Sequence, residues 1–234
     1  MKKIIKKILL FFGYEVKHVF NKRDSLYRPL YSPWFGESVF LQHYTKCSDK
    51  TLVSQDRCYI LFKTLMQSIT KDGDVIECGV YKGGTAALMA SCMHEAKLSK
   101  KLYLFDTFEG MPETDLEKDW HKKGDFSDTS IEAVKDFVGF PEMVNFRKGL
   151  LPLTFQGLEN TRFCFAHIDL DIYRSIWDAL EFIWPRLVTG GFIIFDDYGF
   201  PSCPGAREAV DEFFLNKDFV PLCIPTGQAI VFKA

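Results

Sequence analysis

The sequence predicts an α/β fold: a doubly wound, mostly parallel, seven-stranded sheet with an antiparallel C-terminal hairpin and an N-terminal helical and lid extension. Two observations carry this prediction. From residue 74 onward, short apolar runs alternate with segments of helical period, a rhythm typical of parallel sheets with helices on both faces. The chain then ends in two apolar runs separated by Pro225-Thr226-Gly227, which is the pattern of a hairpin. The 234 residues suffice for one such domain with a large core.

The order of the elements follows from the spacing of the apolar residues. A helix over 54–70 precedes the first core strand, because its apolar residues recur every three or four positions. A later helix over 175–187 is expected to be closed by Gly190 and Gly191. The expected strands cover 74–78, 101–106, 144–148, 162–170, 192–195, 219–224 and 228–232, and the other expected helices cover 84–97, 130–138 and 205–215.

The first 50 residues differ in composition from the domain expected over 51–234. Residues 1–23 hold seven of the 29 Lys and Arg residues but one of the 31 Asp and Glu residues. Apolar residues at helical spacing make this segment a basic amphipathic helix, suited to a membrane surface or to a partner. The alternative is a helix that caps the domain or pairs two subunits. The first alternative predicts a peripheral membrane contact through residues 1–20, and the second predicts a packed helix. We also expect a homo-oligomer.

The segment from 21 to 50 is rich in Tyr, Phe, Pro and Ser. Pro29, Pro33 and Gly36 are expected to break any regular element there. This composition predicts an ordered aromatic lid or connection that precedes the catalytic domain.

Overall charge and cysteine spacing exclude several classes of protein. A net charge of −2 and a pI near 6.2 argue against nucleic-acid binding, which needs a basic face to neutralise phosphates. The seven cysteines show no Cys-x-x-Cys spacing, so reduced thiols are expected. The apolar stretch near the start is too short to span a membrane and lacks the small-residue cleavage site of a signal peptide. We expect a cytoplasmic protein, at most peripheral at the inner membrane face.

A glycine-containing loop joins the first core strand to its helix. Gly79 and Gly83 have the spacing Gly-x-x-x-Gly, unlike the Gly-x-Gly-x-x-Gly of dinucleotide sites. Glu77 places a negative charge where a pyrophosphate would lie, and its carboxylate suits the ammonium of an amino-acid group. Asp106, at the tip of the next strand, is placed to accept both ribose hydroxyls. These residues favour S-adenosylmethionine; the alternative is that the glycines only form a turn and Asp106 only caps a helix.

Two acidic pairs follow later core strands: Asp169 with Asp171, and Asp196 with Asp197. The carboxyl ends of parallel strands meet at one edge of the sheet, so the four carboxylates are expected to converge. Their mutual repulsion calls for a cation, most simply Mg²⁺ or another hard divalent ion. His167 is expected to be a buried strand residue and not a ligand. The alternative is that Asp171 caps a helix and the second pair only forms a turn.

The chemistry expected of such a cluster is methyl transfer to an alcohol. A bound dication lowers the pKa of a substrate hydroxyl, and a carboxylate outside its coordination shell takes the proton.

Five segments of the sequence resemble the macrocin O-methyltransferase family, whose members methylate sugar hydroxyls of antibiotics. They are IECGVYKGG at 76–84, FDTFEGMP at 105–112, GDFS at 124–127, HIDLDIY at 167–173 and FDDY at 195–198. The resemblance covers about 54–215 and implies a class I, Rossmann-like methyltransferase fold. It does not extend to the basic N-terminal helix or to the aromatic segment, so it leaves the acceptor unidentified.

The resemblance implies a role for each matching residue. Asp169, Asp196 and Asp197 match the metal-binding carboxylates of the family, and Asp171 matches its general base. The implied acceptor is a sugar-containing small molecule or glycan precursor. Two alternatives stay open: a catechol-like phenolic acceptor, or a non-catalytic nucleoside-binding or assembly subunit of the same fold. The positions implied to contact S-adenosylmethionine are Glu77, Gly79, Val80, Tyr81, Gly83, Asp106 and Ser127.

Overall fold

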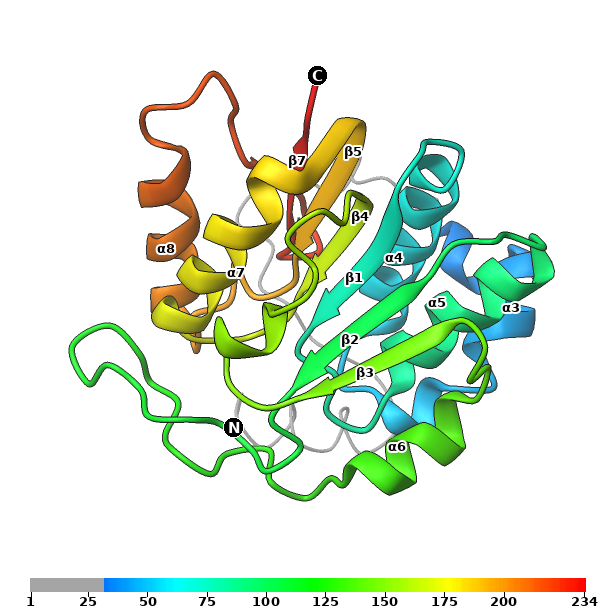
Figure 1. The fold of residues 1–234 in the computed structure, drawn as a ribbon, viewed down its shortest axis with the longest axis horizontal. Helices are drawn as coiled ribbons and strands as arrows, with labels where there is room; N and C mark the ends of the chain where they lie inside the picture. The colour runs from blue at the N-terminus through cyan, green and yellow to red at the C-terminus, as the bar shows by residue number, and fades with distance from the viewer. Residues whose placement is uncertain (1–31) are drawn as a thin grey trace, which may run out of the picture. The chain divides into compact units, whose positions relative to one another are not determined.

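Seven strands form one sheet, in the order β3-β2-β1-β4-β5-β7-β6, in the computed structural model, which describes residues 32–234 (Figure 1). β1 to β5 are parallel, β7 is antiparallel to β5, and β6 is antiparallel to β7. The predicted mostly parallel sheet and its C-terminal hairpin are therefore confirmed. The strands are β1 (Asp74–Cys78), β2 (Leu102–Asp106), β3 (Val144–Lys148), β4 (Phe163–Ile168), β5 (Leu187–Phe195), β6 (Leu222–Cys223) and β7 (Ala229–Phe232).

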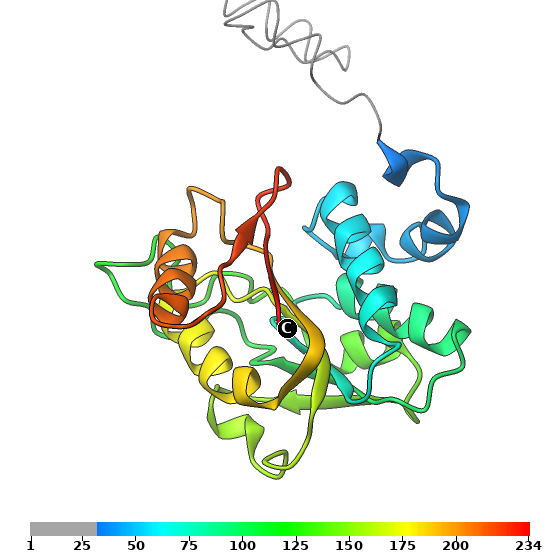
Figure 2. The same ribbon diagram turned by 90° about the horizontal axis from the view of Figure 1, so that it is seen from above.

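Helices cover both faces of the sheet, as the sequence predicts (Figure 2). α3, α4, α5 and α6 pack on one face, and α7 and α8 pack on the other. The described α-helices are α3 (Ser38–Tyr44), α4 (Gln55–Ser68), α5 (Gly84–Glu95), α6 (Ile131–Val138), α7 (Tyr173–Arg186) and α8 (Pro204–Phe214), with 3₁₀ turns at Pro33–Phe35, Ser48–Lys50 and Leu153–Phe155.

Alternate side chains of the central strands enter two separate apolar cores. In β1, Val75 packs with the core under α4 and α5, whereas Ile76 packs with the core under α7 and α8. In β2, Leu104 packs with the first of these cores and Phe105 packs with the second. Burying each such side chain contributes about 1.5–3 kcal/mol, so both helical layers are held firmly on the sheet. This rigid support fixes the positions of the loops that leave the strand ends.

One helix lies where none was predicted. α3 forms after Gly36, in the segment expected to lack regular structure. Its Phe40 is fully buried and packs edge-on against Tyr59 of α4, so burial on α4 stabilises a helix of only seven residues. The compact unit that contains the sheet runs from Trp34 to Ala234 and includes α3.

The predicted end of α7 is also wrong in one respect. Gly190 and Gly191 do not close this helix but lie inside β5, which begins directly after it. The reason is a non-local ladder: the Gly190 N–H donates to the Lys233 carbonyl, and the Lys233 N–H donates to the Gly191 carbonyl. A positive φ of 84° at Gly190 lets the strand continue through this point.

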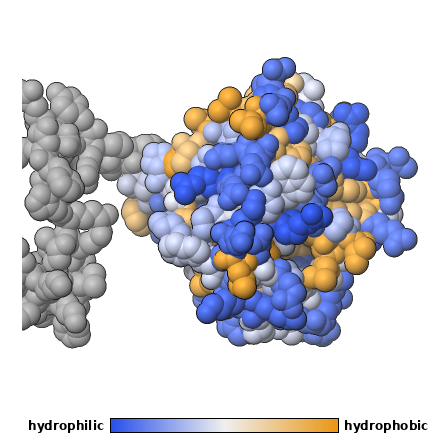
Figure 3. All heavy atoms as spheres, turned by 90° about the vertical axis from the view of Figure 1, so that its left-hand side faces the viewer, coloured by the Kyte–Doolittle hydropathy of each residue, from blue (hydrophilic) through white to orange (hydrophobic). Residues whose placement is uncertain are grey.

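Several predictions concern residues 1–31, which lie outside the described part of the chain. They are the basic amphipathic helix, the membrane or subunit contact through residues 1–20, and the first part of the lid. Within residues 32–234, no helix has the length and apolarity needed to cross a bilayer. The face in Figure 3 is mainly hydrophilic, with smaller separate hydrophobic areas.

Candidate active site

A cavity of about 480 Å³ lies at the carboxyl ends of four parallel strands. Its wall includes Gly79 after β1, Asp106 at the end of β2, Asp169 after β4 and Asp196 after β5. Doubly wound sheets bind their ligands at this edge, because loops from neighbouring strands diverge there and leave a crevice. The structure therefore brings the glycine loop and the acidic cluster to one cavity.

Gly79 is required by the close approach of two loops. Its φ is +89°, and a Cβ built there would overlap the backbone carbonyl of Asp169. The Asp169 N–H donates to the carbonyl of Cys78 at 2.8 Å, which fixes this approach. The glycine thus allows the loop after β4 to lie directly against the loop after β1, and it positions the Asp169 carboxylate.

Asp106 holds the glycine loop through backbone hydrogen bonds. Its Oδ2 accepts from the N–H groups of Val80 at 2.7 Å and Tyr81 at 2.9 Å, and its Oδ1 accepts from the Phe108 N–H at 2.7 Å. Val80 and Tyr81 line the cavity together with Asp106. Oδ1 also accepts from the Thr107 hydroxyl at 3.5 Å, so both oxygens of Asp106 are engaged by the loops that form this part of the wall.

Glu77 does not lie where the sequence argument expected it. The residue has no exposed surface, is absent from the cavity wall, and its Oε1 pairs with His167 Nδ1 at 2.9 Å. The reason is sheet register: Glu77 in β1 lies beside His167 in β4, and both side chains are enclosed by the core. The prediction of His167 as a buried strand residue is confirmed. Direct contact of Glu77 with a cofactor ammonium is not supported by this position.

Two other expected cofactor contacts also lie away from the cavity wall. Gly83 is the N-cap of α5 with a φ of +85°, and a Cβ there would lie 2.8 Å from a Val134 methyl group of α6, so this glycine allows the close packing of α5 and α6. Ser127 packs beside Gly110, which lines the cavity while Ser127 does not. Both residues shape the site from behind.

Asp169, Asp196 and Asp197 form the predicted acidic cluster. One carboxylate oxygen from each lies within 4.8 Å of the others. Burial raises the pKa of Asp169 well above its usual range, and the charges of Asp196 and Asp197 raise it further. Burial also raises the pKa of Asp197, and the charges of Asp171 and Asp196 raise it further. An all-oxygen set under mutual repulsion fits a hard dication such as Mg²⁺.

Asp196 has partners that the sequence did not predict. Arg57 of α4 forms an ion pair with its Oδ2, and the fully buried Gln228 amide donates to its Oδ1 at 2.8 Å. His167 Nε2 lies 3.7 Å from the same oxygen. Burial acts to raise the pKa of Asp196, but His167, Arg57 and Gln228 together hold it below its ordinary value. Asp196 is thereby kept ionised at the centre of the cluster.

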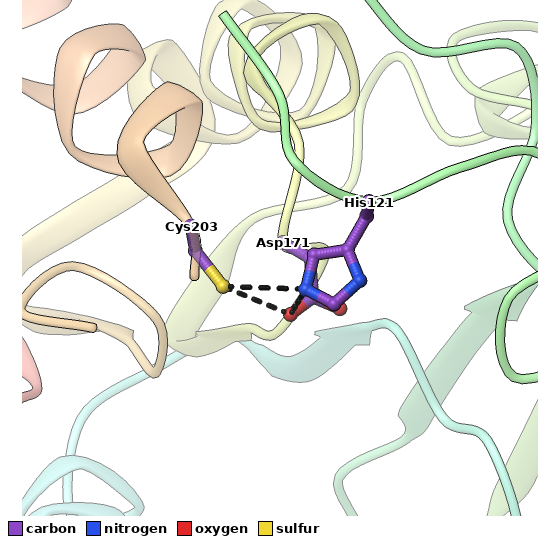
Figure 4. Close-up of side chains that lie close together, drawn as sticks. All are labelled: His121, Asp171 and Cys203. Atoms are coloured by element: carbon purple, nitrogen blue, oxygen red, sulfur yellow. Dashed lines mark hydrogen bonds and ion pairs between the residues drawn. The ribbon is translucent and has the colours of Figure 1, made fainter. Parts of the chain in front are cut away.

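Asp171 lies beside this cluster in an unusual backbone conformation. Its φ is +60°, a region that non-glycine residues rarely occupy and that is often found at functional sites. Burial raises the pKa of its carboxyl group. The carboxylate lies 3.3 Å from Cys203 Sγ and 3.6 Å from His121 Nε2 (Figure 4). Both of these neighbours line the cavity.

The residues missed from the sequence share one property. Their contacts join distant segments: 139 positions separate Arg57 from Asp196, and 82 separate His121 from Cys203. Gln228 reaches Asp196 from the final hairpin. No spacing or local motif marks such pairs, because tertiary packing alone brings them together.

Comparisons with known proteins agree with this geometry. The model of a family described as macrocin-O-methyltransferase (TylF) matches residues 47–221. The chain is 32% identical over 153 residues to the 8-demethyl-8-(2,3-dimethoxy-alpha-L-rhamnosyl)-tetracenomycin-C 4'-O-methyltransferase of Streptomyces olivaceus, covering 60% of this chain and 58% of that protein. It is 30% identical over 155 residues to mycinamicin III 3''-O-methyltransferase of Micromonospora griseorubida, covering 60% of each. The matched segment thus spans about three fifths of these relatives.

Solved structures identify the fold. The O-methyltransferase NovP superposes with a TM-score of 0.67 and 24% identity, over 79% of this chain and 82% of that one. The calicheamicin methyltransferase CalS11 superposes with a TM-score of 0.64 and 18% identity, over 94% and 99% of the two chains. These likenesses, with the observed strand order, confirm the class I methyltransferase fold. By the family model that matches most of its length, the chain belongs to the macrocin O-methyltransferase (TylF) family.

Proposed function

We propose that this chain is an S-adenosylmethionine-dependent O-methyltransferase that methylates a hydroxyl of a sugar-containing small molecule or glycan precursor, assisted by Mg²⁺ or another divalent cation. The observation that carries the proposal is the convergence of Asp169, Asp196 and Asp197 beside the loop that contains Gly79. Asp171 lies next to them on the same cavity. The loop proposed to bind the methyl donor, the proposed dication ligands and the proposed base therefore all line the same cavity.

The cavity wall supports S-adenosylmethionine as the donor. The loop after β1 begins with Gly79, which has no side chain, and Asp106 lies on the cavity wall at the tip of β2. An O-methyltransferase from Bacillus cereus with this fold was solved in complex with SAH, at 15% identity and a TM-score of 0.53. Adenosine recognition by Asp106 and the glycine loop is part of the proposal.

The acidic cluster supports metal assistance. Asp169, Asp196 and Asp197 would hold a dication, which would supply Lewis-acid chemistry and lower the pKa of a hydroxyl beside it. Asp171 takes the proton of this hydroxyl as a general base, and the oxygen then accepts the methyl group from the sulfonium donor. Arg57 and Gln228 orient Asp196 through its two oxygens. The buried Glu77–His167 pair supports the same carboxylate from the core side.

The relatives support a sugar hydroxyl as the acceptor. The name of the Streptomyces olivaceus protein contains a rhamnosyl group, and CalS11 is described as a TDP-rhamnose 3'-O-methyltransferase. The loop between β2 and α6 contributes Met111, Pro112 and Phe126 to the cavity wall. Apolar and aromatic groups on this wall suit the apolar faces of a glycoside ring.

The experiment supplies S-adenosylmethionine, Mg²⁺ and a panel of acceptors: rhamnosides, a nucleotide-linked rhamnose and simple catechols. We expect a mass increase of one methyl group on a glycosidic acceptor, seen by mass spectrometry. Methylation of catechols alone would contradict the acceptor class. Failure of the protein to bind S-adenosylmethionine in calorimetry would contradict the whole proposal, including methyl transfer.

Two further proposals concern residues outside the described part of the chain. We propose peripheral membrane contact through residues 1–20, at the inner face of the cytoplasmic membrane, and a homo-oligomer. Deletion of residues 1–20 should abolish sedimentation with anionic vesicles, and light scattering should give a mass of at least two chains. A monomeric mass would contradict the homo-oligomer. Vesicle binding that survives the deletion would contradict membrane contact through residues 1–20.

A further inference from the structure

We propose that His121, Asp171 and Cys203 form a second metal site, selective for a soft or borderline transition-metal dication such as Zn²⁺, on the wall of the active-site cavity. The three side chains come from three segments: the loop between β2 and α6, the loop after β4, and the N-cap of α8 (Figure 4). Within residues 32–234 they form a group whose ligand atoms all lie within 4.8 Å of one another.

The spacing of the three ligand atoms matches a tetrahedral ion. Cys203 Sγ lies 3.3 Å from Asp171 Oδ1 and 3.6 Å from His121 Nε2, and His121 Nε2 lies 3.6 Å from Asp171 Oδ1. Zinc–sulfur bonds of about 2.3 Å and zinc–nitrogen or zinc–oxygen bonds of about 2.0–2.1 Å at tetrahedral angles place ligand atoms about 3.3–3.6 Å apart. An ion fits among these atoms with little rearrangement.

A hydrogen bond behind the histidine gives independent support. His121 Nδ1 lies 3.2 Å from Asp125 Oδ2, whose oxygen also accepts from the Lys122 N–H at 3.0 Å. A carboxylate on Nδ1 fixes the tautomer that leaves the Nε2 lone pair facing Asp171 and Cys203. Metal-binding histidines usually have such a partner, which orients the ring and strengthens the nitrogen as a ligand.

Ligand chemistry separates this site from the neighbouring acidic cluster. Asp169, Asp196 and Asp197 offer oxygen atoms alone, which suit Mg²⁺. The second group combines an imidazole nitrogen, a thiolate sulfur and one carboxylate oxygen, a set that favours Zn²⁺, Co²⁺ or similar ions over Mg²⁺. Three protein ligands leave one tetrahedral corner for water or an acceptor hydroxyl in the cavity.

Occupancy of this site would inhibit methyl transfer. Cys203 binds as a thiolate and releases its proton to water, while Asp171 donates a lone pair to the ion. That lone pair is then unavailable to an acceptor hydroxyl. The inhibitory consequence rests on the proposed role of Asp171 in methyl transfer, whereas the ligand set itself does not.

The test uses Co²⁺ as a spectroscopic probe on the full chain, with saturating Mg²⁺ present to fill the acidic cluster. We expect a sulfur-to-cobalt charge-transfer band in the near ultraviolet, at one Co²⁺ per chain, because oxygen ligands alone do not produce this band. Cys203→Ser should abolish it. Cys223→Ser, at the exposed cysteine, should leave it unchanged.

A second variant tests the hydrogen bond behind the histidine. Asp125→Asn should weaken Co²⁺ binding by about 10–100-fold while the band keeps its shape at saturation. Far-ultraviolet circular dichroism verifies that each variant is folded. The proposal is overturned if the wild type gives no band, if Cys203→Ser retains it, or if Asp125→Asn binds Co²⁺ as tightly as the wild type.

The same titration separates the two proposals. If the protein binds Co²⁺ through Cys203 but methylates no acceptor, the second metal site is supported and the proposed function is contradicted. If the protein methylates a glycoside but shows no Co²⁺ band, the proposed function is supported and the second metal site is contradicted.

Discussion

The backbone N–H of Asp171 donates a hydrogen bond of 3.0 Å to Asp197 Oδ2. This bond ties the proposed general base to the acidic cluster through the main chain, while the Asp171 carboxylate lies on the cavity wall beside Cys203 and His121. The positive φ of Asp171 makes that geometry attainable, since it turns the peptide toward Asp197. The proposed base and the proposed metal ligands are therefore held together by the main chain.

Replacement of the base should affect chemistry and spare donor binding. Asp171→Asn retains the shape of the side chain but cannot take a proton, so we expect turnover to fall by about 10²–10⁴-fold. Calorimetry should show nearly unchanged affinity for S-adenosylmethionine. Asp136→Asn, on the exposed surface of α6, is the matched control and should keep full turnover. Loss of donor binding in Asp171→Asn would instead assign this residue a structural role.

Metal removal should stop the reaction reversibly. We expect excess EDTA to abolish turnover and added Mg²⁺ to restore it. Asp197→Asn removes one charge from the cluster and should raise the Mg²⁺ concentration needed for half-maximal rate by about tenfold or more. Binding of Mn²⁺, followed by electron paramagnetic resonance, gives a readout independent of activity. Undiminished turnover in chelator would show that the cluster does not serve catalysis.

The sequence predicted the strands and the four aspartates because both depend on local pattern. Each core strand is an apolar run, and parallel strands present their carboxyl ends at one edge, so Asp169 and Asp196 were expected at the same edge; the pairing of β4 with β5 makes them neighbours. The burial of Glu77 against His167 was not predicted, because this pairing is set by the register between β1 and β4. His121 and Cys203 were missed because helix packing and loop closure bring them to Asp171, and neither leaves a local signal.

The buried position of Glu77 leads us to expect that this residue contributes to the stability of the fold. Glu77→Gln should reduce the free energy of unfolding by about 3–5 kcal/mol, because it replaces the carboxylate beside Nδ1 of the fully buried His167 with a neutral amide, and the remaining carboxylate, that of Asp196, lies farther away at 3.7 Å from Nε2. Urea denaturation measures this loss, and Glu181→Gln on the exposed side of α7 is the control. A variant with unchanged stability and strongly weakened S-adenosylmethionine binding would restore the original assignment of Glu77 to the cofactor.

Gly79→Ala tests the close approach of the loops after β1 and β4. The new methyl group would overlap the Asp169 carbonyl and force the loops apart, in addition to the strain of a positive φ. Gly157→Ala is the matched control, since its φ of +85° carries the same strain but no atom lies within 4 Å of the added Cβ. We expect Gly157→Ala to lower the free energy of unfolding by about 1–3 kcal/mol and Gly79→Ala to lower it further. Equal losses in the two variants would show that the contact with Asp169 is unimportant.

The protonation of the buried His43 should make the stability of the protein depend on pH. Its ring is 3% exposed, and burial holds the pKa of His43 below the ordinary value of 6.5, although Glu95 acts in the opposite direction. The folded state therefore binds fewer protons at this site than the unfolded state. The associated stability is present above about pH 6.5 and is lost as the pH falls through the lower folded-state pKa.

The measurement compares wild type with His43→Gln, which retains a polar group for the Ser91 hydroxyl that now lies 2.7 Å from His43 Nδ1. We expect the urea midpoint of the wild type to fall more than that of the variant between about pH 7.5 and pH 5, because only the wild type must protonate this buried ring on unfolding. Parallel pH profiles for the two proteins would contradict the assignment. A steeper fall in the variant would mean that Glu95, which lies 3.3 Å from His43 Nε2, outweighs the cost of burial.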